Sequence, residues 1–182
     1  MKKVMIPLGE GFEEIEAVTN IDVFRRAGLE VVTAGLGKKE VEGDHGLKIK
    51  ADLLIKEVDI NEIEAIVLPG GMPGAENLRN SDKLLWLISE LDQKGGLVAA
   101  ICAAPMVLDK AGVIEDKNAT SYPGFKRKMP SCNYFEERVV RDHNVITGRG
   151  PGVAMEFALE VVRYLLGHEK VDELKEQMLT NF

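Results

Sequence analysis

The sequence predicts an α/β fold with a mostly parallel central sheet, and two features of its 182 residues predict it. Short apolar runs of strand length alternate with longer stretches in which apolar residues recur every three or four positions. Several of the short runs end in glycine-rich turns that lead into such a stretch, as at residues 9–11 and 69–71. Strands that alternate with amphipathic helices form a mainly parallel sheet covered on both faces. We therefore expect a flavodoxin-like three-layer sandwich with a small β-hairpin.

The first part of the chain is expected to form a β-α-β unit followed by the hairpin. Residues 2–8 and 29–34 have the composition of strands, and a helix is expected between them over about 13–27, ending at Gly28. One face of this helix is apolar and carries Ile15, Val18, Ile21 and Phe24. The glycine-punctuated segment 35–52 predicts a small hairpin beside the main sheet.

The middle of the chain supplies two further strands and two helices. A strand is expected at 64–68, and Ser81 is a good N-cap for the next helix. The buried stripe of that helix is expected to be Leu84, Leu87, Ile88 and Leu91. Glycines at 95–96 end it, and the apolar run up to Ile101 predicts another strand. Residues 103–108, with Pro105 in the first turn, predict the start of a helix.

The last third is expected to finish the sheet with a pair of strands and to end in helices. We expect a connection with strand potential at 112–122, a loop with a helical turn at 125–135, and two strands at 137–141 and 144–147. A strand-to-helix junction is expected at 148–152. The helix after it should end at Gly167 and have the core residues Phe157, Val161, Val162 and Leu165, and a tail helix is expected at about 170–178.

Composition and charge argue against several classes of protein. With 45% hydrophobic residues the chain can bury one substantial core, so we expect a single domain over residues 1–182. A net charge of −7 argues against binding of nucleic acid or of anionic membranes, because phosphate groups require a concentrated basic face. The basic cluster 126–128 is expected to be solvated surface. No apolar stretch has the roughly 18 to 20 residues of a membrane span, and no signal-peptide core opens the sequence, which favours a cytoplasmic protein.

The cysteines and glycine-rich turns imply no metal or cofactor. Cys102 and Cys132 are too far apart in sequence for a metal-ligand pair or a disulfide framework, so both are expected to be free thiols. Cys132 is expected to be a passive thiol in a loop. The turns at 9–11 and 69–71 match neither the dinucleotide fingerprint nor the P-loop.

The strongest candidate for chemistry is Cys102, at the point where a strand changes abruptly into a helix. Such an elbow lifts one side chain out of the sheet edge and places it among the free N–H groups of a helix N-terminus, which stabilise negative charge. We therefore expect an acidic, reactive thiol. The alternative is an inert core thiol, because free cysteine is among the most buried residue types.

A carboxyl group is expected to lie within reach of Cys102. The junctions after Leu8, Leu68 and Ile101 all lie at the carboxyl edge of the predicted sheet, where ligands bind in such folds. Glu16, on the first turns of the first helix, is the candidate acid. The helical pattern alone does not decide whether Glu13 or Glu16 turns inward, and acids in a first helical turn also occur simply because they complement the helix dipole.

Several motifs together resemble the ThiJ/PfpI superfamily, and within it the Parkinsonism-associated deglycase branch and its bacterial YajL-type members. The motifs occur in order over nearly the whole chain, at residues 13–18, 24–28, 67–71, 99–105 and 148–152. The resemblance implies that Cys102 is the reactive, oxidation-sensitive cysteine and that Glu16 is the carboxyl group that hydrogen-bonds it. It also implies that backbone N–H groups of Gly71 and Ala103 form an oxyanion-hole-like pocket, that the glutamic acid is protonated beside the thiolate, and that the protein is a homodimer.

The sequence departs from the family pattern at two informative positions. Many members have a histidine in the segment that here contains Tyr122, although YajL-type members also lack it, so a Cys–His dyad with that partner is excluded. Peptidase-like members have a histidine directly after the cysteine, where this chain has Ala103, which argues against proteolysis. Tyr122 and His45 are the secondary site candidates. Tyr122 occupies the place of the missing histidine, and His45 is included because family dimers bring a basic residue from this region toward the neighbour's cysteine; the alternative for His45 is a solvated loop residue.

Three functions follow from these features. In the first, Cys102 acts as a glyoxalase or deglycase on small carbonyl compounds such as methylglyoxal, or on their adducts on Cys, Lys and Arg of proteins. In the second, the protein is a non-enzymatic redox sensor or redox-regulated chaperone that works through oxidation of Cys102 and binds oxidised proteins. In the third, the cysteine only packs within a structural domain.

Overall fold

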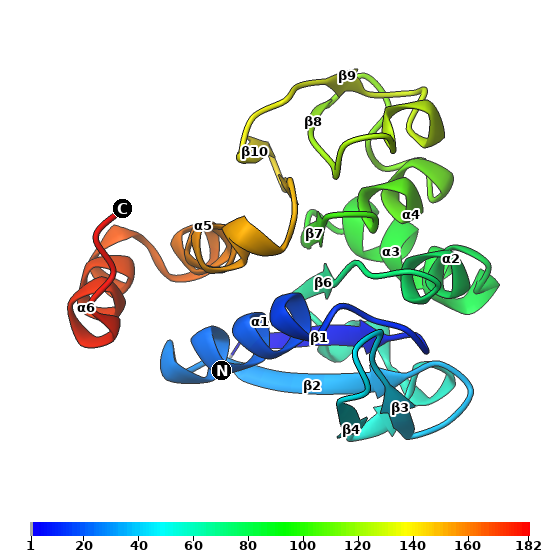
Figure 1. Cartoon of the computed structure of the whole chain (residues 1–182), viewed down its shortest axis with the longest axis horizontal. Helices are drawn as coiled ribbons and strands as arrows, with labels where there is room; N and C mark the ends of the chain where they lie inside the picture. The colour runs from blue at the N-terminus through cyan, green and yellow to red at the C-terminus, as the bar shows by residue number, and fades with distance from the viewer. Residues whose placement is uncertain (1) are drawn as a thin grey trace.

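The computed structural model describes residues 2–182 and is organised around a seven-stranded sheet (Figure 1). The strand order is β10-β11-β7-β6-β1-β2-β5, and every neighbouring pair is parallel except β10 with β11. The strands of this sheet are β1 (Lys3–Leu8), β2 (Glu30–Gly35), β5 (Leu53–Leu54), β6 (Ala65–Leu68), β7 (Leu97–Ile101), β10 (Val139–Asp142) and β11 (Val145–Gly148).

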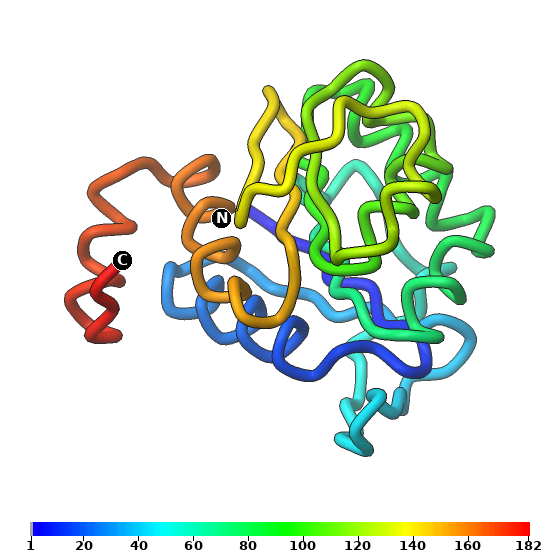
Figure 2. The backbone as a smooth tube through the Cα atoms, turned by 45° about the horizontal axis from the view of Figure 1, so that its top comes forward, coloured from blue at the N-terminus to red at the C-terminus, as the bar shows by residue number. Residues whose placement is uncertain are grey.

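Two small sheets stand beside the main one. β3 (Glu40–Glu42) and β4 (Lys48–Lys50) form an antiparallel hairpin, and β8 (Asn118–Ala119) pairs in parallel with β9 (Asn133–Tyr134). Figure 2 shows the β3–β4 hairpin projecting from the body of the molecule. Both the mostly parallel sheet and the hairpin agree with the fold predicted from the sequence.

Helices cover both faces of the sheet. They are α1 (Glu14–Arg26), α2 (Gly74–Arg79), α3 (Asp82–Gln93), α4 (Pro105–Lys110), α5 (Ala154–Leu166) and α6 (His168–Met178), with short 3-10 helices η1 (Ile55–Glu57), η2 (Ile60–Glu62), η3 (Lys126–Lys128) and η4 (Pro151–Val153). The interior of the described chain divides into two hydrophobic clusters, one under α1, α5 and α6 and the other under α2, α3 and α4. Along β7, Ala99 belongs to the first cluster and Val98 and Ala100 to the second, as the alternation of side chains along a strand requires.

The expected strands and the long helices are confirmed, with boundaries shifted by a few residues. The four apolar residues expected in the stripe of α3 are all buried, and Ser81 caps that helix by accepting a hydrogen bond from the N–H of Leu84. α4 begins at Pro105 rather than at Ala103. The short α2, β5 and the pairing of β8 with β9 are absent from the predictions, because elements of two to six residues carry too little periodicity to be recognised.

One prediction about α1 is wrong. Of the four residues on its expected apolar face only Phe24 is buried, whereas Ile15 is 56% and Val18 is 42% exposed. The buried face instead includes Glu16 and Asn20. Polar side chains thus occupy part of the face that packs on the sheet, so hydrophobicity alone identifies only part of the buried face of this helix.

Within residues 2–182, no helix combines the length and the apolar composition required to cross a membrane.

Candidate functional site

Cys102 lies at a strained elbow directly after β7. Its φ angle is 64°, in the left-handed region that a non-glycine residue rarely occupies and that costs about 1–2 kcal/mol. Two backbone hydrogen bonds hold it there: its N–H donates to the carbonyl oxygen of Gly148 over 2.9 Å, and its own carbonyl accepts from the N–H of Tyr122 over 2.8 Å. The predicted elbow is therefore present, and the thiol at its tip is only partly buried.

Glu16 is the carboxyl group that turns inward. It is fully buried, and its Oε2 accepts a hydrogen bond from the backbone N–H of Gly70 over 2.7 Å. Asn20, one turn further along α1, donates from Nδ2 to the backbone carbonyl of Glu16 over 2.7 Å. Glu13 instead caps the helix, since its Oε1 accepts from the N–H of Ile15 over 3.3 Å. The choice between the two acids that the sequence leaves open is thus decided by the fold.

The turn after β6 brings the acid and the thiol together. An ideal Cβ added to Gly70 would lie 2.7 Å from Cβ of Cys102 and 2.8 Å from Oε2 of Glu16, so only glycine leaves room for both groups at this position. The carboxyl of Glu16 and the thiol of Cys102 lie close enough for each to shift the pKa of the other, and backbone groups of Gly71 and Ala103 also act on the pKa of the thiol. All four site residues expected around the elbow are therefore neighbours.

Burial raises the pKa values of both titratable groups in the site. The pKa of Glu16 rises to about 7, chiefly because the carboxylate loses its hydration, while hydrogen bonds from Gly70 and Cys102 act in the opposite direction. Burial, followed by the negative charge of ionised Glu16, raises the pKa of Cys102 to about 12. Hydrogen bonds from the backbone of Gly71 and Ala103 lower the pKa of the thiol but do not offset the larger effects.

The expectation of an acidic thiol is therefore wrong for the state in which Glu16 is ionised. The backbone donors expected at the elbow are present, but desolvation and the adjacent carboxylate outweigh them. Two acids in such close contact titrate as a pair, so the protonation of Cys102 depends on whether Glu16 holds a proton.

The two secondary candidates lie in different places. Tyr122 is 47% exposed and is joined to the Cys102 elbow through its backbone N–H. It also lines a hollow of about 310 Å³ together with Arg149 and Gly150. His45 lies in the exposed turn of the β3–β4 hairpin, where its Nδ1 is 2.9 Å from Oε2 of Glu14, and no hydrogen bond or ion pair joins it to Cys102 within the described chain.

Two residues that position the acid have no assigned role in the sequence predictions, although Gly70 is expected near Glu16 and Cys102. Gly70 anchors the Glu16 carboxylate through its backbone N–H. The pair of glycines at 70–71 is the sequence feature that could have indicated a close backbone contact here. Asn20 is only 1% exposed. Its position four residues after Glu16, on the same face of the helix, is the sequence signal that could have indicated its contact with Glu16. Neither signal distinguishes a structural contact from a functional one without the fold.

The sequence matches the model of the DJ-1/PfpI family over residues 2–164. It is 40% identical to Protein dj-1beta of Drosophila melanogaster over 100% of this chain and 98% of that protein. It is 37% identical to Glutathione-independent glyoxalase DJR-1.2 of Caenorhabditis elegans over 91% of this chain and 89% of that protein. Protein DJ-1 homolog B of Arabidopsis thaliana is 42% identical over 95% of this chain, but the chain spans only 40% of the length of that relative.

Solved structures show the same relationship. The crystal structure of Drosophila melanogaster DJ-1beta superposes with a TM-score of 0.95 at 40% identity and covers 100% of this chain and 99% of its own. The structure of oxidised Toxoplasma gondii DJ-1 has a TM-score of 0.95 at 39% identity, with 100% of both chains covered. The fold, the family model and the full-length similarity agree, and the chain belongs to the DJ-1/PfpI family.

Proposed function

We propose that the protein is a cysteine-dependent glyoxalase or deglycase that acts on methylglyoxal or on its early adducts on Cys, Lys and Arg side chains. The observation that carries the proposal is the group formed by the Cys102 thiol, the buried Glu16 carboxyl and the backbone of Gly71 and Ala103. A nucleophile, a proton-transfer group and donors for a developing oxyanion are the components that carbonyl addition requires.

The reactive state in this proposal is the one in which Glu16 holds the proton of the pair. A protonated carboxyl removes the negative charge that raises the pKa of Cys102, and it donates a hydrogen bond to the thiolate. The raised pKa of Glu16, about 7, keeps a substantial fraction of the carboxyl protonated at neutral pH. Burial keeps Glu16 neutral and thereby favours the Cys102 thiolate, which a negative charge on Glu16 would oppose.

The reaction begins with attack of the Cys102 sulfur on the aldehyde carbon of methylglyoxal. The new C–S bond converts the carbonyl oxygen into an oxyanion, which accepts hydrogen bonds from the N–H groups of Gly71 and Ala103 and then takes a proton. Glu16 then carries a proton from the former aldehyde carbon to the neighbouring carbon, and the hydroxyl proton moves to the former ketone oxygen. These two transfers give a thioester of lactate. Water hydrolyses that thioester and restores the thiol. On a protein adduct, the sulfur attacks the former aldehyde carbon, whose bond to the protein nitrogen or sulfur breaks as the new C–S bond forms. The released side chain takes a proton and is restored to its unmodified form, and methylglyoxal is left as the same adduct on Cys102.

One observation outside the site supports the proposal. The nematode relative, 37% identical, is named a glutathione-independent glyoxalase. The proposal that glycated proteins are substrates is based on the family resemblance alone.

The experiment that tests the proposal is conversion of methylglyoxal to lactate by the purified chain. Cys102→Ser is expected to abolish the activity, and Cys132→Ser, which replaces the second free thiol, is the matched control that should retain it. Equal activity in Cys102→Ser would overturn the proposal. Release of methylglyoxal from a pre-formed adduct on a cysteine peptide tests the deglycase reaction in the same variants.

A redox sensor or redox-regulated chaperone is the second candidate function. A partly exposed thiol beside a hydrogen-bonding acid favours it, because a sulfenic or sulfinic acid formed at Cys102 could be stabilised by Glu16. The related Toxoplasma protein has been solved in an oxidised form. Mass spectrometry after mild peroxide treatment tests it: Cys102 should oxidise before Cys132, and equal oxidation of the two would remove its basis.

We also propose that the chain forms a homodimer through α1 and the hairpin. Ile15 and Val18 expose apolar surface on α1, and Leu47 of the hairpin is 48% exposed. Ile15 and Leu47 line one shared hollow, which makes the exposed surface continuous between the two elements. Exposed apolar side chains that gather in this way are typical of contact surfaces.

A further inference from the structure

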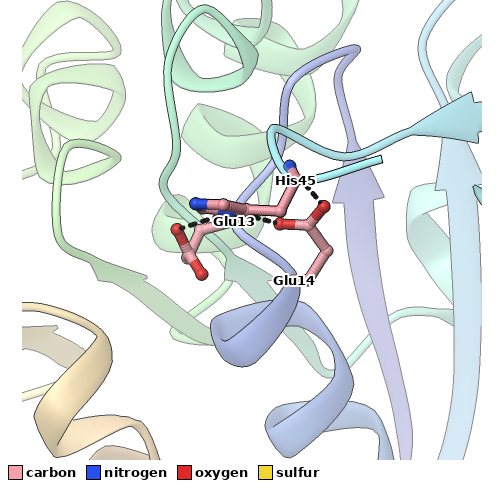
Figure 3. A group of neighbouring side chains, drawn as sticks. All are labelled: Glu13, Glu14 and His45. Atoms are coloured by element: carbon pink, nitrogen blue, oxygen red, sulfur yellow. Dashed lines mark hydrogen bonds and ion pairs between the residues drawn. The ribbon is translucent and has the colours of Figure 1, made fainter. Parts of the chain in front are cut away.

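A cluster of two carboxylates and one imidazole lies beside the Cys102–Glu16 pair but is not part of it. It joins Glu13 and Glu14, at the N-terminal end of α1, to His45 in the turn of the hairpin (Figure 3). Nδ1 of His45 is 2.9 Å from Oε2 of Glu14 and 3.9 Å from Oε2 of Glu13. One potential ligand atom from each residue lies within 4.8 Å of the other two.

We propose that Glu13, Glu14 and His45 bind one divalent cation, with Zn²⁺ as the best match. One imidazole nitrogen and two carboxylate oxygens are ligands that zinc accepts, and three protein ligands leave a fourth position for water. Bonds of about 2.1 Å in a tetrahedron place neighbouring ligand atoms about 3.4 Å apart. The two distances from His45 Nδ1, 2.9 and 3.9 Å, lie on either side of that spacing, so small side-chain rotations suffice.

The charge of the cluster favours a cation. The side chains of Glu13 and Glu14 are only 14% and 12% exposed. Within residues 2–182 no lysine or arginine forms an ion pair with either carboxylate, and His45 is the only basic side chain within ion-pair distance of both. Two carboxylates that face one imidazole leave a surplus of negative charge with little exposure to water, which a divalent ion would neutralise.

Backbone hydrogen bonds fix the orientation of both carboxylates. Oε1 of Glu14 accepts hydrogen bonds from the N–H groups of His45 (2.6 Å) and Leu47 (3.3 Å), and Oε1 of Glu13 accepts from the N–H of Ile15. Each glutamate therefore has one oxygen anchored by backbone donors and the other directed toward His45. Such anchoring by surrounding groups is what fixes metal ligands in proteins.

In the single chain the cluster is open to solvent, and in the proposed homodimer it would lie at the subunit contact, because Ile15 and Leu47 belong to both surfaces. Glu13, Glu14 and His45 line a hollow of about 270 Å³ together with Ile15 and Leu47. The side chain of His45 is 69% exposed, so its ring can exchange its contact with Glu14 for a metal bond without disturbing the core. The histidine is 31 residues from Glu14 in sequence, which explains why no ligand spacing indicates the site.

Zinc binding to the full-length chain tests the proposal. Free thiols are potential zinc ligands, so the titration uses the chain with Cys102→Ser and Cys132→Ser. Calorimetry with Zn²⁺ alone is expected to give one site per chain. Adding His45→Gln or Glu13→Gln should weaken binding by about tenfold or more, since even outer-sphere partners contribute this much. Zinc should also shift the imidazole resonances of His45 in the nuclear magnetic resonance spectrum.

A matched histidine is available as the control. His143 also pairs through Nδ1 with one carboxylate, Asp142, at 2.6 Å, but it belongs to no group of three potential ligands among the described residues. His143→Gln should leave zinc affinity unchanged. The proposal is overturned if the chain with both cysteines replaced does not bind Zn²⁺, or if His45→Gln binds it as tightly as the parent does.

Discussion

Oε2 of Glu16 accepts a hydrogen bond of 2.7 Å from the backbone N–H of Gly70, and this contact joins two segments that are 54 residues apart in the sequence. It fixes the carboxyl of α1 at the turn after β6, where the elbow after β7 presents Cys102. Three consecutive strands of the sheet, β1, β6 and β7, thus deliver the acid, its anchor and the thiol to one edge. The chemistry of the site depends on this buried acid.

Stability is expected to fall as the pH rises through the pKa of Glu16. The folded-state pKa is raised from 4.5 to about 7, so between these values the folded chain holds a proton that the unfolded chain has lost. The contribution of protonated Glu16 to the free energy of unfolding is fully present below the unfolded-state pKa of 4.5 and is lost as the pH rises through the folded-state pKa of about 7. It corresponds to about 3 kcal/mol.

Glu16→Gln should therefore remove most of the decrease in the free energy of unfolding between pH 4.5 and 7.5, as measured by urea denaturation. Glu169→Gln replaces an exposed carboxyl of α6 and is the matched control, which should keep the decrease of the parent. A parent chain and a Glu16→Gln variant with parallel pH profiles would show that the acid is not held in its neutral form by burial.

Gly70→Ala is expected to separate the acid from the thiol. Its Cβ would lie 2.7 Å from Cβ of Cys102 and 2.8 Å from Oε2 of Glu16, so one of the two side chains must move. The rate of Cys102 alkylation should change, and the chain should lose about 1–3 kcal/mol of stability. Gly152→Ala is the control, because an added Cβ there meets nothing within 4 Å and neither glycine requires a positive φ. Similar effects of the two substitutions would contradict the close packing around Gly70.

A charge on the exposed face of α1 is expected to prevent dimer formation. Ile15→Lys and Val18→Lys should convert the chain from a dimer to a monomer in sedimentation velocity experiments, because burial of an unpaired ammonium group is costly. Leu166→Lys replaces an apolar side chain of α5 that is 38% exposed, outside the proposed surface, and should leave the dimer intact. A monomeric parent chain, or dimeric variants, would exclude this interface.

The fold could be predicted from the sequence because its long elements are regular. The strands are continuous apolar runs, and the stripe of α3 repeats at helical spacing up to Leu91, so pattern and burial agree. α1 is different. Its exposed Ile15 and buried Glu16 break the rule that apolar residues lie inside, and such local conflicts are expected where a residue serves a site or an interface.

The neighbours of the candidate site could be predicted, but its protonation could not. That Cys102, Glu16 and Gly71 meet at one sheet edge follows from strand order and from the family resemblance. The pKa of Cys102 depends on how completely the thiol and Glu16 are desolvated and on their contact with each other, and neither quantity is visible in a sequence. The contact of His45 with Glu14 likewise depends on where the hairpin folds back onto α1.

The central claim is that Cys102 and Glu16 share their protons, and the pH dependence of Cys102 alkylation tests it most directly. In a coupled pair the thiolate first appears as the pair loses one proton, so the parent rate should rise near pH 7 and again at much higher pH. Glu16→Gln has only the thiol to titrate and should give a single rise at a different pH. Superimposable profiles for the parent and Glu16→Gln would contradict the claim.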